Sequence, residues 1–256
     1  NVYPKTLFDR SKKNWKLKKH LFIANNSLTI IPVSEWVGEQ VRKSFLKHKR
    51  IQVIPNGIDT SVFKPTFFSD IPVLSPQLLL FQTLTNDKFV IMSVASQWKF
   101  EKGLDDYKAM SAILKEDEVI VLVGVDDDLI AELPLNIIGI KRITNAPELA
   151  VLYTRADVVT VLSSAETFGL TVVEGYACGT PAVVYNNTAP PLLIESGTGY
   201  VVENKNYQLA YSAIQKIKKN GKQYYTDNCI RAAKEKYNKD ECFKKYLNLY
   251  EQLINE

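Results

Sequence analysis

The chain has 256 residues, 46% of them hydrophobic and 23% charged, with a formal net charge of +4. These values are typical of one large or two modest folded domains, and they exclude a disordered chain. The longest apolar stretch, residues 119–125, is too short to span a bilayer, and 28 interspersed acidic residues give no reason to expect a nucleic-acid partner.

The N-terminal part of the chain is strongly basic. Residues 5–19 carry seven lysines and arginines against a single acid, Asp9. Apolar residues interleaved with the lysines predict a helix over residues 10–24. Such a basic face is most often solvated, and the alternative is peripheral contact with a membrane surface or an acidic substrate.

A strand–helix–strand unit follows the basic helix. Short β-rich runs at 28–33 and 51–54 flank a helix expected over residues 35–47, with the preceding serine as its N-cap. This order is the unit of a parallel sheet, and Pro55-Asn56-Gly57 predicts a turn after it. We expect residues 1–63 to be the C-terminal remnant of a first lobe, together with a hinge.

Residues 64–88 differ in composition, because three prolines interrupt them. We expect this stretch to be a linker between two lobes. Within it, Ser75 and Pro76 are an N-cap and a first-turn proline, which predict a short helix at 77–81.

Residues 89–238 alternate between apolar strands and helices. The expected strands are 89–94, 118–123, 137–140, 158–162 and 182–185, and the helices between them are 104–114, 128–133, 147–154 and 170–178. The strands are continuous Val/Ile/Leu runs, so both faces of the sheet should be covered by helices. The pattern predicts a Rossmann-like, doubly wound parallel-sheet domain.

The C-terminal part is predicted to be helical over 206–219, 223–237 and 240–255. The last of these helices has an apolar stripe along one face, which needs a partner surface. We therefore expect residues 239–256 to pack back on the N-terminal lobe.

Few residue types suited to metal or nucleophile sites are present. The cysteines at 178, 229 and 242 contain no CxxC pair, so we expect reduced, inert thiols in a cytoplasmic protein. His20 and His48 lie among lysines, which argues against a histidine metal site or a Ser-His-Asp triad.

Two loops at the carboxyl ends of strands carry chemistry suited to a ligand. In the first, Lys102 precedes Gly103 before a helix, so an ammonium and helix N-terminal amides lie close together and suit a phosphate. The alternative interpretation of Lys102 is a surface lysine before a helix.

The second loop ends at Gly169, before the helix at 170–178. Amides near Gly169 and Leu170 can bind an anion, and the glycine allows close approach. Glu166 and Glu174 would repel a bare phosphate, but each carboxylate can accept from two hydroxyls. A diphosphate between a sugar and a ribose would satisfy both, and the alternative is a helix N-terminal acid beside a surface glutamate.

The two glutamates lie seven residues apart within ETFGLTVVEGYACGTPAVV, which resembles the E-x7-E signature of retaining GT-B glycosyltransferases (glycosyltransferases group 1). Further segments resemble that group in the same order, over about residues 28 to 205: VSEWV (33–37), VIPNGIDTSVFKP (53–65), the Lys102-Gly103 pair, ELAVLYTRADVVTVLSS (148–164) and TGYVV (198–202).

The resemblance implies a GT-B type α/β protein, with one complete Rossmann-like domain and the C-terminal remnant of a second. It implies sugar transfer from a nucleotide diphosphate sugar to a glycan or lipid-linked acceptor, with retention and without metal or cofactor, in bacterial-type polysaccharide or glycoconjugate synthesis. Two-lobed members need roughly 350 residues or more, so we expect an N-terminally truncated enzyme with an intact donor half.

The resemblance also implies roles for individual residues. Lys102 and Glu166 would be catalytic, Lys102 on the donor diphosphate and Glu166 on hydroxyls of the transferred sugar. Glu174 would bind the ribose hydroxyls. The backbone amides of Phe168, Gly169 and Leu170 would hold the diphosphate, and the loop 141–144, with Arg142 and Ile143, would lie near the base.

Three positions depart from the pattern of the group. Gln97, followed by Trp98, stands where the group usually has an arginine, and a neutral amide can donate to a phosphate but supplies no charge. We still expect both residues at the donor. Thr167 replaces a glycine, and Leu192 stands where a glutamate often follows the proline.

Other functions remain as alternatives. The chain could be a nucleotide-sugar-binding module without activity of its own, or an epimerase or phosphorylase with the same two-lobed fold. Residues 126–128 are three consecutive aspartates, and an Asp-x-Asp motif binds metal in glycosyltransferases of another fold. Capping of a helix N-terminus explains the three aspartates without a metal.

Overall fold

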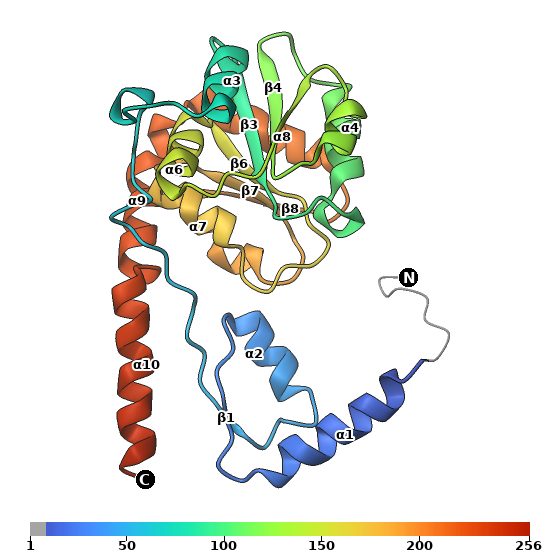
Figure 1. Cartoon of the computed structure of the whole chain (residues 1–256), viewed down its shortest axis with the longest axis vertical. Coiled ribbons are helices and arrows are strands. Elements are labelled where there is room, and N and C mark those ends of the chain that lie inside the picture. Colours follow the sequence, from blue (N-terminus) through green and yellow to red (C-terminus); the bar gives the residue numbers. More distant parts are fainter. Residues whose placement is uncertain (1–8) are drawn as a thin grey trace. The chain divides into compact units, whose positions relative to one another are not determined.

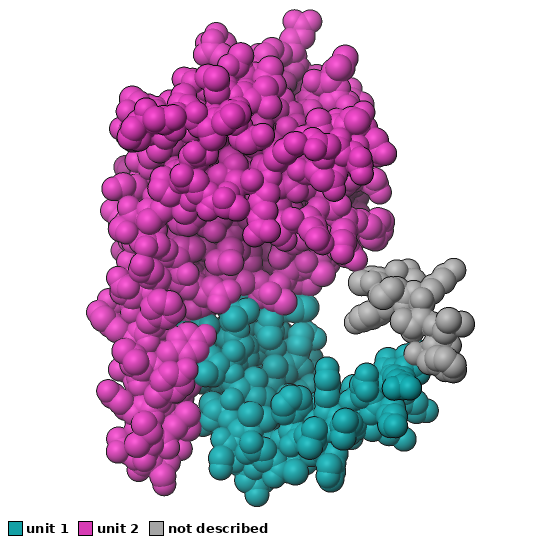
Figure 2. Space-filling view, in the orientation of Figure 1, with its two compact units in different colours: residues 1–54 teal, residues 55–256 magenta. Residues whose placement is uncertain are grey.

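The computed structural model describes residues 9–256, so Lys5 of the basic segment lies outside the described residues. The chain divides into two compact units, residues 1–54 and residues 55–256 (Figure 2). No helix within residues 9–256 combines the length and the apolar character needed to cross a membrane.

The first unit contains the expected strand–helix–strand element. Its elements are α1 (Ser11–Ala24), β1 (Thr29–Ile30), α2 (Glu35–Arg42) and β2 (Arg50–Ile51). The two strands pair in parallel, and Ser34 Oγ accepts from the Val37 amide, which confirms the predicted cap. Helix α2 ends five residues earlier than expected, because the Ser44 side chain bonds the Val41 carbonyl and the Leu46 amide.

The second unit is built on a six-stranded parallel sheet, in the order β5-β4-β3-β6-β7-β8 (Figure 1). Its strands are β3 (Phe89–Val94), β4 (Glu118–Val123), β5 (Ile137–Ile140), β6 (Val158–Val161), β7 (Ala182–Tyr185) and β8 (Gly199–Val202). The register pairs Val94 with Val123, so the carboxyl ends of β3 and β4 are level. Strand β8 was not expected, because this edge strand is only partly buried and lacks the continuous apolar run of the others.

Helices cover both faces of this sheet, as the apolar strands predicted. The helices of the second unit are α3 (Pro76–Thr85), α4 (Leu104–Ser111), α5 (Asp127–Ala131), α6 (Ala146–Arg155), α7 (Leu170–Ala177), α8 (Tyr207–Asn220), α9 (Gln223–Lys236) and α10 (Lys239–Ile254). Helix α10 extends away from the sheet (Figure 1). Val90 and Met92 of β3 lie in the core cluster beside α3 and α6. Ser93 faces the other way and bonds the Tyr107 hydroxyl of α4. The unit is therefore a doubly wound, Rossmann-like domain.

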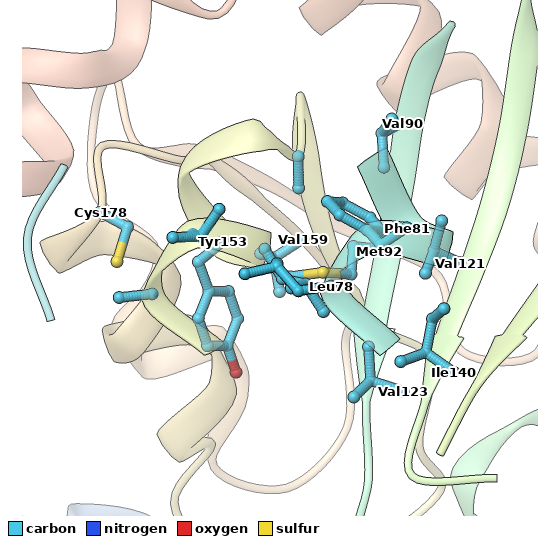
Figure 3. Close-up of a cluster of buried hydrophobic side chains, with 14 of the residues drawn as sticks. Leu78, Phe81, Val90, Met92, Val121, Val123, Ile140, Tyr153, Val159 and Cys178 are labelled. Atoms are coloured by element: carbon cyan, nitrogen blue, oxygen red, sulfur yellow. The ribbon is translucent and has the colours of Figure 1, made fainter. Parts of the chain in front are cut away.

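The main hydrophobic core extends across the region expected to be a linker. Leu78 and Phe81 of α3 are fully buried against Met92, Val121 and other strand residues (Figure 3). Residues 64–88 thus contribute to the core of the second unit, because α3 has large apolar side chains to bury. The three cysteines are unpaired and buried, and burial raises the pKa of the Cys178 thiol to about 12, as expected for inert thiols.

The chain segment that enters the second unit is held by the start of α10. The Ile58 amide donates to the Tyr237 carbonyl at 2.7 Å, and Lys239 pairs with Asp59 at 2.5 Å. On α10 the expected apolar stripe is exposed at Phe243 and Leu247. Its packing on the first lobe stays a prediction.

Candidate active site

The sheet has its topological switch point between β3 and β6, where the strand order runs outward in both directions. In open α/β sheets, ligands bind outside the carboxyl ends of the strands at such a point. A cavity of about 510 Å³, which we call the donor cavity, lies there. Its lining includes eight of the predicted residues: Lys102, Arg142, Ile143, Glu166, Phe168, Gly169, Leu170 and Glu174.

Lys102 is positioned by a close approach of two loops. The Ser164 amide donates to the Glu101 carbonyl at 2.8 Å. Gly103 has a φ of +75°, and a β-carbon there would lie 2.3 Å from the Leu162 carbonyl oxygen. Only glycine fits this contact, which holds Lys102 against the end of β6.

Helix α7 presents an uncapped N-terminus to the donor cavity. It begins after Gly169, whose φ of +108° favours glycine, and a β-carbon at this position would lie 3.0 Å from Leu193 Cδ1. Among residues 9–256 no side chain caps the helix. The Val172 amide donates to the Gly169 carbonyl at 3.0 Å, so the amides available to a ligand are those that precede Val172. The helix dipole and these amides together favour an anion.

Lys102 and Glu166 form an ion pair in the donor cavity, with side chains 30% and 23% exposed. Ser163 Oγ also donates to Glu166 at 3.3 Å, and the Glu166 amide donates to Thr188 Oγ1 at 2.9 Å. These contacts hold the carboxylate in place. An ammonium has three donors, so Lys102 can bind an anion while it still contacts Glu166.

Glu174 is the most buried carboxylate of the donor cavity. The Tyr153 hydroxyl donates to its Oε2 at 2.7 Å. Burial raises the pKa of Glu174 to about 7, although the hydrogen bond from Tyr153 acts in the opposite direction. At neutral pH a substantial fraction of Glu174 is uncharged, which reduces its repulsion of a diphosphate.

Arg142 is a second cation on the wall of the donor cavity. It is exposed, and it forms no hydrogen bond or ion pair with any residue of the range 9–256. Arg142 can therefore supply the positive charge that Gln97 lacks.

Gln97 and Trp98 lie beside the donor cavity and not in its lining. They line a neighbouring cavity of about 600 Å³, which shares Ser96, Gly124 and Arg142 with the first. The Trp98 indole donates to the Val123 carbonyl at 3.0 Å, so its N–H is already used. Leu192 is exposed and does not line the donor cavity, whereas Thr167 does.

The three aspartates at 126–128 have local partners. Asp126 accepts from the Leu129 amide at 2.9 Å and caps α5, which confirms the capping interpretation. Asp127 pairs with Lys141.

Sequence reasoning missed three residues at this site: Asn56, Tyr153 and Thr188. Asn56 lines the donor cavity, Tyr153 binds Glu174, and Thr188 binds the Glu166 amide. Asn56 and Tyr153 lie in the quoted segments 53–65 and 148–164, which could have drawn attention to them. No local pattern marks Thr188, because its contact spans 22 positions of the chain.

Comparison with known proteins shows the family of the chain. The family described as Glycosyl transferases group 1 matches residues 78–236, which is more than half of the chain. A probable sucrose-phosphate synthase of Thermosipho melanesiensis is 29% identical over 214 residues, covering 79% of this chain and 48% of the relative. An alpha-monoglucosyldiacylglycerol synthase of Acholeplasma laidlawii is 30% identical over 204 residues, covering 73% of this chain and 48% of the relative.

Solved structures share the fold. The sucrose-phosphate synthase of Thermosynechococcus elongatus superposes with a TM-score of 0.77 at 20% identity, over 98% of this chain and 64% of that one. The Anabaena protein HepE, solved with UDP-glucose, has a TM-score of 0.73 at 19% identity, over 94% of this chain and 68% of HepE. The chain spans about half the length of the curated relatives it matches.

Proposed function

The chain belongs to the glycosyl transferases group 1 family, and from this premise we propose that it binds a nucleotide diphosphate sugar and transfers the sugar with retention of configuration. The acceptor is a glycan or a lipid-linked glycan, as in polysaccharide or glycoconjugate synthesis. The reaction uses neither a metal nor a cofactor. HepE, solved with UDP-glucose, supports a nucleotide sugar as the donor.

One observation carries the proposal: Lys102, Glu166, Glu174 and the free N-terminus of α7 line a single cavity at the switch point. In the proposed complex, Lys102, Arg142 and the amides of residues 168–170 bind the diphosphate. Glu166 accepts from hydroxyls of the sugar, Glu174 accepts from the ribose, and Ile143 lies near the base.

These groups act on the leaving group by electrostatics. The bond between the anomeric carbon and the diphosphate oxygen breaks, and its electron pair leaves with the diphosphate. The acceptor oxygen bonds to the same face of that carbon, and its hydroxyl proton passes to the released diphosphate. Lys102, Arg142 and the helix amides stabilise the developing negative charge without having to reorient.

A ligand panel tests the proposal, because a ligand that binds only the folded chain raises its melting temperature. We expect one series among uridine, guanosine and adenosine diphosphate sugars to stabilise the chain. Within that series, the sugar conjugate should bind about tenfold tighter than the free nucleoside diphosphate, from charged hydrogen bonds worth roughly 1.5–3 kcal/mol. Glu166→Gln should remove this preference.

Glu101→Gln is the matched control, because Glu101 precedes Lys102 in the chain but does not line the donor cavity. It should keep the preference for the sugar conjugate. Equal binding of both ligands by the unaltered chain would refute the sugar role of Glu166, and no stabilisation by any nucleotide would refute the proposed function.

A binding module without activity is the second candidate. One observation favours it: Gln97 stands where the group has an arginine. A glycosyl-transfer assay separates the candidates, with NMR of the first product to assign its anomeric configuration. Binding without turnover supports the module, and an inverted product would refute retention.

Donor affinity is expected to depend on pH, because Glu174 must be ionised to accept from the ribose. With a pKa of about 7 in the empty cavity, the carboxylate forms as the pH rises from 6 to 8, so affinity should rise over this window. The probe is a nucleotide sugar, whose phosphates do not titrate in this range. Calorimetry at several pH values measures the trend, and Glu174→Gln should abolish it; an unchanged pH profile in that variant would exclude Glu174 as its origin.

We further propose that the protein acts in the cytoplasm and contacts the inner face of the membrane peripherally. Helix α1 supports this, since it has exposed Trp15 and Phe22 among lysines and no buried residue. Co-sedimentation of the protein with vesicles containing anionic lipid tests the contact. If an equal share of the protein sediments with neutral vesicles, this would count against it.

A further inference from the structure

Tyr153 does not line the donor cavity, and its hydroxyl bonds Glu174, which does. Its side chain is 0% exposed, and its hydroxyl donates to Glu174 Oε2 at 2.7 Å. The ring packs edge-on against Phe63, with 6.2 Å between centroids. The Thr180 hydroxyl donates to the Tyr153 carbonyl at 2.5 Å, so both the ring and the backbone of Tyr153 are held in place.

This contact determines what Glu174 can offer a ligand. The carboxylate has two oxygens, and the bond from Tyr153 occupies Oε2, which leaves Oε1 for groups in the donor cavity. Burial disfavours the ionised form of Glu174, and the phenol is the hydrogen bond that opposes this effect. Without the phenol, Glu174 would ionise less readily and its carboxyl plane would lose an anchor.

We propose that Tyr153 is a positioning residue for ribose recognition, because its hydroxyl orients Glu174 as a hydrogen-bond acceptor toward the donor's ribose. The inference rests on the proposed function. It makes the affinity for the ribose depend on a residue of α6 that does not itself touch the ligand. A merely structural tyrosine would affect all ligands alike.

The test compares a ribonucleoside diphosphate with its 2′,3′-dideoxy analogue, using the base selected by the ligand panel. The unaltered chain should bind the ribonucleotide at least tenfold tighter. Tyr153→Phe keeps the ring and removes the hydroxyl, so the preference should fall to about twofold while affinity for the dideoxy ligand stays within a factor of two. In a Glu174→Gln background, Tyr153→Phe should have no further effect on the preference.

Tyr107→Phe is the matched control. Tyr107 is also fully buried, and its hydroxyl bonds Ser93 on the opposite face of the sheet. It should lower the melting temperature without changing the ribose preference. The ribose preference depends on pH, and its midpoint is the pH at which half of the full preference is present. If Tyr153→Phe does not fold, 3,5-difluorotyrosine at position 153 retains the hydroxyl as a stronger donor. This substitution should move the midpoint of the ribose preference to lower pH.

The pH readout must account for the other charged groups near Glu174. The charged groups are Lys102, Arg142 and Glu166 on the cavity wall, and the Cys178 thiol directly after α7 is a further titratable group. In Tyr153→Phe the midpoint of the ribose preference should move to higher pH. A full ribose preference and an unchanged midpoint in this variant would overturn the inference, whereas no preference in the unaltered chain would overturn the ribose role in the proposed function.

Discussion

Replacing Lys102 with alanine is expected to weaken binding of the preferred nucleoside diphosphate about 100-fold, consistent with charged hydrogen bonds worth roughly 1.5–3 kcal/mol each. Among residues 9–256, the change removes one of the two cations that line the donor cavity, and it leaves Glu166 without its ion-pair partner. An unneutralised carboxylate then faces the diphosphate. Isothermal titration calorimetry at pH 7.5 measures the loss.

The control for net charge is Lys219→Ala. Lys219 is exposed on α8 and does not line the donor cavity, so its removal should leave affinity within a factor of two. Raising the salt concentration should weaken binding to the unaltered chain more than to Lys102→Ala, because fewer charges contact the ligand in the variant. Unchanged affinity in Lys102→Ala would mean that the diphosphate binds elsewhere.

Replacing Lys218 with methionine is expected to destabilise the chain by about 3–5 kcal/mol, the usual cost of leaving a buried charge without its partner. Lys218 bonds Glu118 at 2.7 Å, and the Glu118 side chain is 0% exposed at the start of β4. Tyr211 and Gln215 also donate to this carboxylate, so α8 is bonded to the sheet there. Urea denaturation at pH 7 measures the loss.

The pH dependence of this effect follows from the pKa of Glu118. Burial alone would raise that pKa, but the hydrogen bonds from Lys218 and its neighbours lower it from 4.5 to about 2. The stability from Glu118 is therefore complete above the unfolded-state value near 4.5, and it is lost as the pH falls toward 2. The difference in the free energy of unfolding between Lys218→Met and the unaltered chain should therefore decrease as the pH falls from 4.5 toward 2.

Lys219→Met serves as the control for stability, since it removes an exposed charge from the same helix. It should change the free energy of unfolding by less than about 0.5 kcal/mol. A loss in Lys218→Met no larger than in this control would show that the Glu118 cluster contributes nothing to stability.

Several features of this protein follow from local patterns in the sequence. Continuous apolar strands separated by amphipathic helices predicted a doubly wound parallel sheet, because a strand buried on both faces needs apolar residues at every position. Ser34 and Asp126 could be recognised as caps, because a cap bonds amides two or three residues away. Lys102 and Glu166 could be placed near each other, because both follow strands of one parallel sheet.

Other features were settled only by the tertiary structure. Strand β8 and the burial of Leu78 and Phe81 depend on which neighbours the fold supplies, and no local periodicity encodes a neighbour. The hydrogen bond from Tyr153 to Glu174 joins two helices across 21 positions of the chain. The same holds for the raised pKa of Glu174, since burial is a property of the surrounding atoms. The sequence alone thus determined the chemistry at the strand ends, whereas packing decided how each group is charged and oriented.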